Sequence, residues 1–171
     1  MFMALISRRS LLYTVVISIL LLSLPGAILQ LVRTGDPYLF GERFFQDMVA
    51  RLSGPGRLRF VLQPTVALIL GARDGWKDAR SGCPPFLWGL LFSGRHRSAL
   101  VRSAFESVRD LVAIAILLDI ISQILIFRNV HPGAALLLGP VLISTPYALS
   151  RALSNRIEKF RTHSSSSASV R

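Results

Sequence analysis

Three long uncharged stretches dominate the pattern of hydrophobic and polar positions along the chain. They cover residues 11–32, 111–127 and 134–149, and only Asp119 interrupts them with a charge. A helix rises about 1.5 Å per residue, so a run of roughly 20 apolar residues crosses the hydrocarbon core of a bilayer, which is about 30 Å thick. The pattern therefore predicts an all-α, multi-pass membrane protein with three firm transmembrane helices.

A fourth apolar segment, residues 60–72, is shorter. As a helix it would cover only about 20 Å, which favours a short embedded helix over a full crossing. The distribution of Lys and Arg leaves both three and four crossings open, and three crossings give the cleaner separation of charge. Both topologies place the turn at residues 128–133 outside, and residues 73–110 and the C-terminal segment inside.

Residues 36–52 predict an amphipathic helix that lies in the membrane interface. Asp36-Pro37 is typical of a helix start. The apolar side chains recur at helical spacing on one face, and polar ones occupy the other. The apolar face comprises Phe40, Phe44, Phe45, Met48, Val49 and Leu52, and the polar face comprises Glu42, Arg43, Gln46, Asp47 and Arg51. A soluble helix packed on its neighbours is the alternative, and the tandem Phe residues favour the interface.

The two ends of the chain complete the predicted organisation. Residues 1–161 are expected to form a single integral membrane domain, and residues 162–171 a disordered polar tail rich in Ser. The basic start and the apolar run also fit a signal peptide over residues 1–27. Because the apolar run continues well past the usual length for such a peptide, an uncleaved membrane span is favoured.

Charge adds a candidate binding surface to this picture. The chain carries a net charge of +11, and its basic residues flank the apolar runs. Basic residues in such positions favour anionic lipid headgroups over nucleic acid, and they would also suit an acidic membrane-protein partner. The candidate headgroup-binding residues lie in the predicted cytoplasmic segment and are Arg73, Lys77, Arg80, Arg95 and Arg97.

Asp119 is the sharpest single candidate for a functional residue. A carboxylate near the bilayer centre costs roughly 2.5–3.5 kcal/mol on insertion scales, so it usually faces the protein interior and has a partner. Gln123 follows one turn later, and Ser144 and Thr145 lie level with Asp119 across the predicted hairpin. No cation is expected to reach Asp119, so we expect a protonated side chain that ties two helices together. The alternative is proton or ion handling in a small transporter subunit.

The string Asp74-Gly75-Trp76-Lys77-Asp78-Ala79-Arg80 resembles the DGxxAR opening of the CDP-alcohol phosphotransferases, multi-pass enzymes of phospholipid synthesis. The resemblance implies a phospholipid-modifying transferase that holds divalent metals on carboxylates. Here one extra residue interrupts the motif, Gly89 matches the family's next Gly, and Ser93 and Arg97 replace its two later Asp. Without those two carboxylates a two-cation site lacks charge and a base. The departures favour a non-enzymatic protein, and the transferase stays the alternative, with Asp74 and Asp78 as its carboxylates.

The remaining sequence signals concern location rather than chemistry. Residues 58–92 resemble small uncharacterised multi-pass proteins of the bacterial inner membrane, which implies location and helical character but no activity. The single Cys83 excludes an intrachain disulfide, and His96, His131 and His163 are too far apart for metal-ligand spacing. The sequence thus predicts a membrane protein that needs no cofactor, metal or nucleic acid, with a biochemical role that the residues do not specify.

Overall fold

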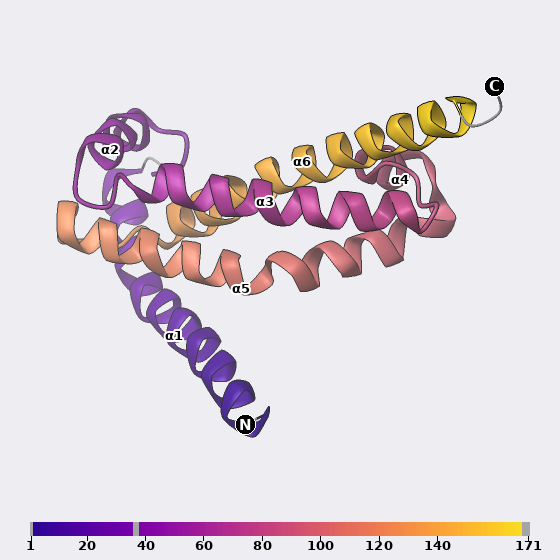
Figure 1. Ribbon diagram of the computed structural model, residues 1–171. Coiled ribbons are helices and arrows are strands. Elements are labelled where there is room, and N and C mark those ends of the chain that lie inside the picture. Colours follow the sequence, from indigo (N-terminus) through magenta and orange to yellow (C-terminus); the bar gives the residue numbers. More distant parts are fainter. Residues whose placement is uncertain (1, 36–37, 169–171) are drawn as a thin grey trace. The chain divides into compact units, whose positions relative to one another are not determined.

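The computed structural model describes residues 2–35 and 38–168, and within these ranges it contains six helices and no strand (Figure 1). The helices are α1 (Phe2–Thr34), α2 (Glu42–Ser53), α3 (Arg59–Arg80), α4 (Phe86–Phe92), α5 (Gly94–Phe127) and α6 (Pro132–Ala168). Three segments are long and apolar enough to cross a membrane, and they are Ser10–Thr34, Arg97–Phe127 and Pro132–Thr162. The prediction of an all-α protein with three membrane-spanning helices is confirmed.

The chain separates into two compact units. Unit 1 comprises Met1–Val61 and Asp110–Leu142, and unit 2 comprises Leu62–Arg109 and Ile143–Arg171. The sequence had predicted one domain over residues 1–161. It also predicted a disordered polar tail over residues 162–171, and both stay predictions. The backbone of α6 is helical to Ala168.

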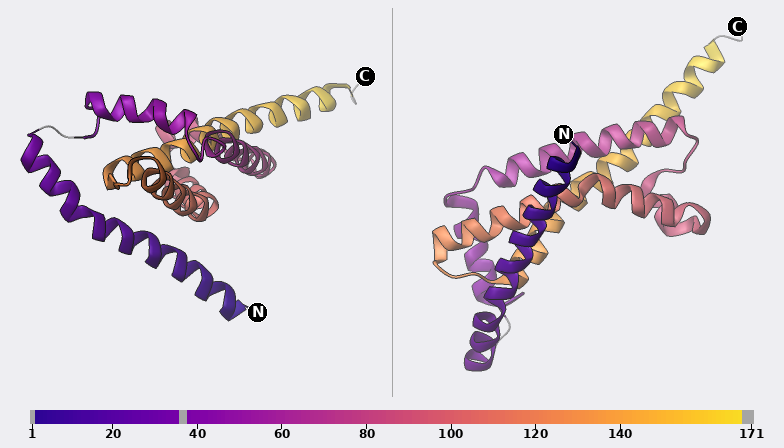
Figure 2. Two further views of the ribbon diagram at one scale, coloured as in Figure 1. Left: turned by 90° about the vertical axis from the view of Figure 1, so that its left-hand side faces the viewer. Right: turned by 90° about the horizontal axis from the view of Figure 1, so that it is seen from below.

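The core of unit 1 joins α1 to the helices of the hairpin at residues 128–131. Val16 of α1 packs with Ile116 and Ile120 of α5 and with Ala135 of α6. A Cβ atom at Gly139 would lie 3.0 Å from the backbone nitrogen of Ile116, so glycine permits the close approach of α5 and α6 there. α1 continues as one helix through Pro25 (Figure 2). The apolar runs of the sequence thus form both the candidate spans and this core.

Helix α2 begins later than predicted and has three faces rather than two. It starts at Glu42, and the predicted start at Asp36-Pro37 lies outside the described residues. Phe45, Val49 and Leu52 are exposed along one side, as an interfacial helix in contact with lipid requires. Arg51, which was expected on the solvent-facing polar side, is instead only 1% exposed. The inward face of α2 therefore carries charge into unit 1.

In unit 2, α3 packs closely on α6 through two glycines one helical turn apart. A Cβ atom at Gly71 would lie 2.4 Å from the carbonyl oxygen of Tyr147, and one at Gly75 would lie 2.3 Å from that of Arg151. The spacing is that of the GxxxG motif, in which small residues let two helix backbones approach within a membrane. The side chain of Ser150 adds a hydrogen bond of 2.7 Å to the carbonyl oxygen of Leu68.

Candidate functional site

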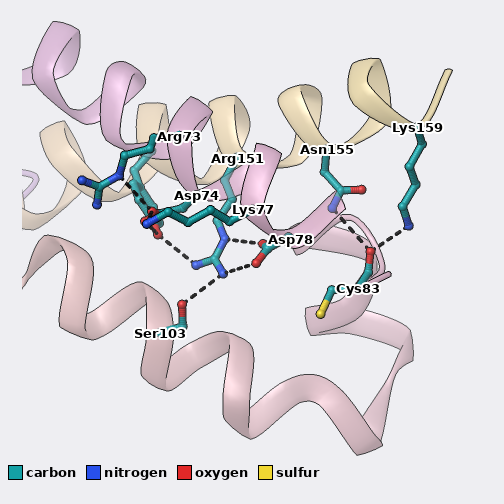
Figure 3. A network of polar contacts seen from close by, with 10 residues as sticks. Arg73, Asp74, Lys77, Asp78, Cys83, Ser103, Arg151, Asn155 and Lys159 are labelled. Atoms are coloured by element: carbon teal, nitrogen blue, oxygen red, sulfur yellow. Dashed lines mark hydrogen bonds and ion pairs between the residues drawn. The ribbon is translucent and has the colours of Figure 1, made fainter. Parts of the chain in front are cut away.

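The last two turns of helix α3, from Arg73 to Arg80, separate their charges by sign onto two faces. Arg73, Lys77 and Arg80 are spaced so that they share one face of the helix, and their side chains are 56%, 67% and 76% exposed. The side chains of Asp74 and Asp78 are only 8% and 14% exposed, because they lie on the face that packs against α6 (Figure 3). The string that resembles a transferase motif is therefore divided between an exposed basic face and a buried acidic one.

Both buried carboxylates of α3 are engaged by side chains of α6. Arg151, which is 1% exposed, donates from Nε and Nη2 to the two oxygens of Asp78 at 2.7 and 3.0 Å (Figure 3). Its Nη1 donates to the hydroxyl of Tyr147 at 2.9 Å, and that hydroxyl donates to Asp74 at 2.9 Å. Its Nη2 also lies 3.2 Å from the hydroxyl of Ser103. A bidentate guanidinium thus satisfies the acidic face from within the protein.

The charge state of Asp74 follows from its surroundings. Burial raises the pKa of this carboxyl, but hydrogen bonds from Ser107 and Tyr147 and the charges of Arg73 and Arg151 outweigh burial and lower the pKa below its ordinary value. Asp74 is therefore ionised at neutral pH. Within the described residues, no group of three or more His, Cys, Asp or Glu side chains is arranged to hold a metal ion.

The predicted headgroup-binding residues fall into separate groups. Arg73, Lys77 and Arg80 lie together on α3, and the indole of Trp76 on the same face is 48% exposed. Arg97 is exposed on α5, where it lines a shallow depression with Arg102 and Phe105. The side chain of Arg95 lies outside the described part of the chain. The basic face of α3 (Arg73, Lys77 and Arg80) is thus the cluster that the structure brings together.

Asp119 has a cationic partner that the sequence did not suggest. It is 1% exposed and forms an ion pair with Arg59, and Nε2 of Gln123 donates to its second oxygen at 2.7 Å. The expectation that no cation reaches Asp119 is therefore wrong. Ser144 and Thr145, the expected partners, are both exposed. Asp119 and Arg59 are 60 positions apart, so helical spacing could not reveal the pair; the need of an intramembrane carboxylate for a counter-charge could have.

A second buried polar cluster in unit 1 continues from Gln123. Oε1 of Gln123 accepts a hydrogen bond of 2.6 Å from the backbone nitrogen of His131. The ring of His131 stacks on that of Tyr38, with centroids 3.7 Å apart. The hydroxyl of Tyr38 donates to Asp47 at 2.5 Å and accepts from Nη2 of Arg51 at 3.3 Å. Burial and Arg51 lower the pKa of His131 while Asp47 opposes them, so the imidazole is neutral at pH 7.

Next to this cluster lies a pocket of about 950 Å³ within unit 1. The end of α1, the turn before α2, the first residues of α2 and the start of α6 form its walls. Tyr38 and His131 are part of the lining, so the pocket borders the polar cluster directly. Sequence patterns did not indicate it, because its walls come from three separate stretches of the chain.

Comparisons of the chain with protein-family models, with curated proteins and with solved structures gave no match.

Proposed function

We propose that the protein is a non-enzymatic integral membrane protein whose basic face of α3 binds the headgroups of anionic phospholipids. Arg73, Lys77 and Arg80 make the contacts, on the cytoplasmic side of a bacterial inner membrane. The observation that carries the proposal is the sorting of charge on α3, which exposes three cations and turns both carboxylates inward. The three candidate spans and the likeness of residues 58–92 to bacterial inner-membrane proteins support the location.

The three cations are held only loosely by acidic residues of unit 2. The nearest pairs are Arg73 with Asp74 at 3.4 Å, Lys77 with Asp74 at 4.0 Å and Arg80 with Glu158 at 3.6 Å. Because the three cations are exposed and these distances are long, each pair contributes about 0–1 kcal/mol and leaves the cation available to phosphate. Near an anionic surface each contributes about 1 kcal/mol, and the amphipathic ring of Trp76 suits the headgroup layer.

The buried polar contacts favour this reading over the two alternatives. A transferase would need Asp74 and Asp78 to exchange their contacts with Tyr147 and Arg151 for metal ions, which a metal-binding measurement would detect. A transporter subunit would need Asp119 to release its partner Arg59 during a proton or ion cycle, which a pH-dependent flux assay would detect. The contacts of Asp74 and Asp78 resemble a satisfied structural network rather than an open metal site. Asp119 is held by an ion pair with Arg59 and a hydrogen bond from Gln123.

Lipid-selective quenching of tryptophan fluorescence tests the proposal. Trp76 and Trp88 are the two tryptophans of the chain, so a Trp88→Phe background isolates Trp76. In nanodiscs of phosphatidylglycerol and phosphatidylcholine, brominated phosphatidylglycerol should quench Trp76 more strongly than brominated phosphatidylcholine at the same mole fraction. The excess quenching should disappear in the triple variant Arg73→Gln, Lys77→Gln, Arg80→Gln and should weaken at high salt, since these contacts are electrostatic.

The matched control removes the same charge from unit 1. Arg33, Arg57 and Arg128 are exposed there, and their triple replacement by Gln should leave the excess quenching of Trp76 intact. Equal quenching by the two lipids in the parent protein would refute the proposal. So would equal losses in the test and control variants, because the effect would then reflect net charge rather than this face.

A further inference from the structure

The pocket of unit 1 lies at the ends of two candidate membrane spans. Its walls include Ala27, Leu31 and Thr34 from the end of α1, and Pro132 from the start of α6. One candidate span ends at Thr34 and another begins at Pro132. Because Thr34 and Pro132 line one pocket, these two helix ends lie on the same side of the membrane, as the topology with four crossings requires. Such helix ends are at the depth where lipid headgroups meet acyl chains. The pocket's volume of about 950 Å³ is in the upper part of the range of small-molecule sites.

The charged groups of the pocket are balanced, and Gln30, Thr34, Tyr38 and His131 add uncharged polar side chains to its lining. Glu42 and Arg43, consecutive in the chain, bring one carboxylate and one guanidinium to the lining. His131 is 8% exposed, and its Nδ1 has no hydrogen-bond partner among the residues that the structure describes. A buried polar atom without a partner costs about 1–3 kcal/mol, so this nitrogen indicates a group that the chain itself does not supply.

Most of the remaining wall is apolar or aromatic. Ala27 and Leu31 belong to the last turns of α1, and Leu39 and Phe40 to the turn before α2. Arg51, whose Nη2 donates to the hydroxyl of Tyr38, is outside the lining and 1% exposed, and its Nε and Nη1 find no acceptor within the described chain. The site thus combines an apolar channel, lined by Ala27, Leu31, Leu39 and Phe40, with polar side chains that include the unpartnered Nδ1 of His131.

We propose that this pocket binds one phospholipid with a zwitterionic headgroup of the phosphatidylethanolamine class. The phosphate accepts hydrogen bonds from Arg43 and from the His131 ring, and the ammonium group pairs with Glu42. An acyl chain lies along Ala27 and Leu31. The balanced lining selects against a purely anionic headgroup, because such a headgroup would leave Glu42 facing a like charge. This site is independent of the basic face of α3, which belongs to unit 2.

Quantifying the phospholipid that stays with the protein tests this site. Protein reconstituted with equal amounts of phosphatidylethanolamine and phosphatidylglycerol is re-extracted in mild detergent, and ³¹P NMR measures each retained lipid per chain. The parent protein should retain phosphatidylethanolamine. Ala27→Trp should abolish this retention because the indole fills the channel, while Leu22→Trp on the same helix, at a position that is 81% exposed and outside the lining, should not.

A second variant tests the headgroup without touching the channel. Glu42 is exposed, so Glu42→Gln should leave the fold intact, as circular dichroism will show, and should remove the preference for phosphatidylethanolamine over phosphatidylglycerol. Equal retention of phosphatidylethanolamine by Ala27→Trp and Leu22→Trp would overturn the site. An unchanged preference in Glu42→Gln would overturn the headgroup assignment. The triple variant of α3 should keep its phosphatidylethanolamine, so failure of either proposal can be told from failure of the other.

Discussion

Two arginines of the molecule are equally buried but very differently satisfied. Arg151 of unit 2 and Arg51 of unit 1 are both 1% exposed, and each lies over a phenylalanine ring, Phe86 and Phe127 respectively. Arg151 also forms a bidentate pair with Asp78. Arg51 has one long hydrogen bond, to a tyrosine hydroxyl, and two N–H groups without acceptors in the described chain.

The contrast separates a structural arginine from one with spare binding capacity. A buried charge with all its donors engaged fixes the geometry of the helices that provide the partners, as Arg151 does for α3 and α6. A buried charge with idle donors is costly unless water or a ligand supplies acceptors. By burial alone the two residues look alike. Their hydrogen bonds distinguish them: Arg151 forms a rigid contact in unit 2, whereas Arg51 has unused donors in unit 1.

Replacing each arginine by Met should give the largest difference in stability between the two sites. Arg151→Met leaves Asp78 buried without its cation and should lower the free energy of unfolding by about 3–5 kcal/mol. Arg51→Met removes an incompletely satisfied charge and should change stability by less than about 1 kcal/mol. Unfolding by SDS in mixed micelles, followed by circular dichroism, measures both. Equal losses would mean that Arg51 has acceptors comparable to those of Arg151.

Asp119 provides the next largest effect and reverses the expectation from sequence. A protonated, cation-free Asp119 would tolerate Asp119→Asn. With Arg59 as its partner, the same substitution leaves a buried guanidinium unpaired and should cost about 2–3 kcal/mol. Adding Arg59→Gln should recover part of that loss, because it removes the unpaired charge. Infrared spectroscopy should show a carboxylate band at neutral pH that Asp119→Asn removes; its absence would argue for a protonated Asp119.

Adding one methyl group where α3 contacts α6 should lower the stability of the protein by a smaller amount. Gly75→Ala would place a Cβ atom 2.3 Å from the carbonyl oxygen of Arg151, a backbone atom that moves only with its helix. Overpacking of this kind should cost about 1–3 kcal/mol. Gly26→Ala is the matched control, since its Cβ would meet nothing within 4 Å. If the two variants unfold alike, α3 and α6 do not pack through this face in the membrane.

The membrane spans could be predicted from the sequence, whereas the polar contacts between helices could not, for a physical reason. Membrane spans arise from local composition, so three of them could be located from apolar runs alone. By contrast, Asp119 pairs with Arg59, 60 residues away, and Asp78 pairs with Arg151, 73 residues away. Local periodicity in the sequence does not indicate pairs at such separations. The glycine pair at 71 and 75, by contrast, has the local spacing of a GxxxG motif, and this signal in the sequence indicates a close helix contact.

The smallest predicted effect concerns the pH dependence of unit 1. His131 is buried beside Tyr38, with Arg51 and Asp47 as the charged groups that act on it. Burial and Arg51 lower its pKa in the folded protein, while Asp47 raises it by a smaller amount. In the unfolded chain the imidazole regains an ordinary pKa of about 6.5 and binds a proton more readily than in the folded state. Protonation below that pH therefore favours unfolding.

The stability associated with a neutral His131 should be fully present above pH 6.5 and should decline as the pH falls from there toward its lowered pKa. The chain has two other histidines, His96 and His163, so the difference between the parent protein and His131→Phe isolates this contribution. Phe keeps an aromatic ring against Tyr38 and cannot titrate. SDS unfolding at pH 7.5 and pH 5.5 should show a larger loss of stability on acidification in the parent than in the variant. Equal losses of stability in the parent and in His131→Phe would mean that water already reaches the imidazole. Water, rather than a lipid headgroup, would then be the hydrogen-bond partner of His131 in the pocket.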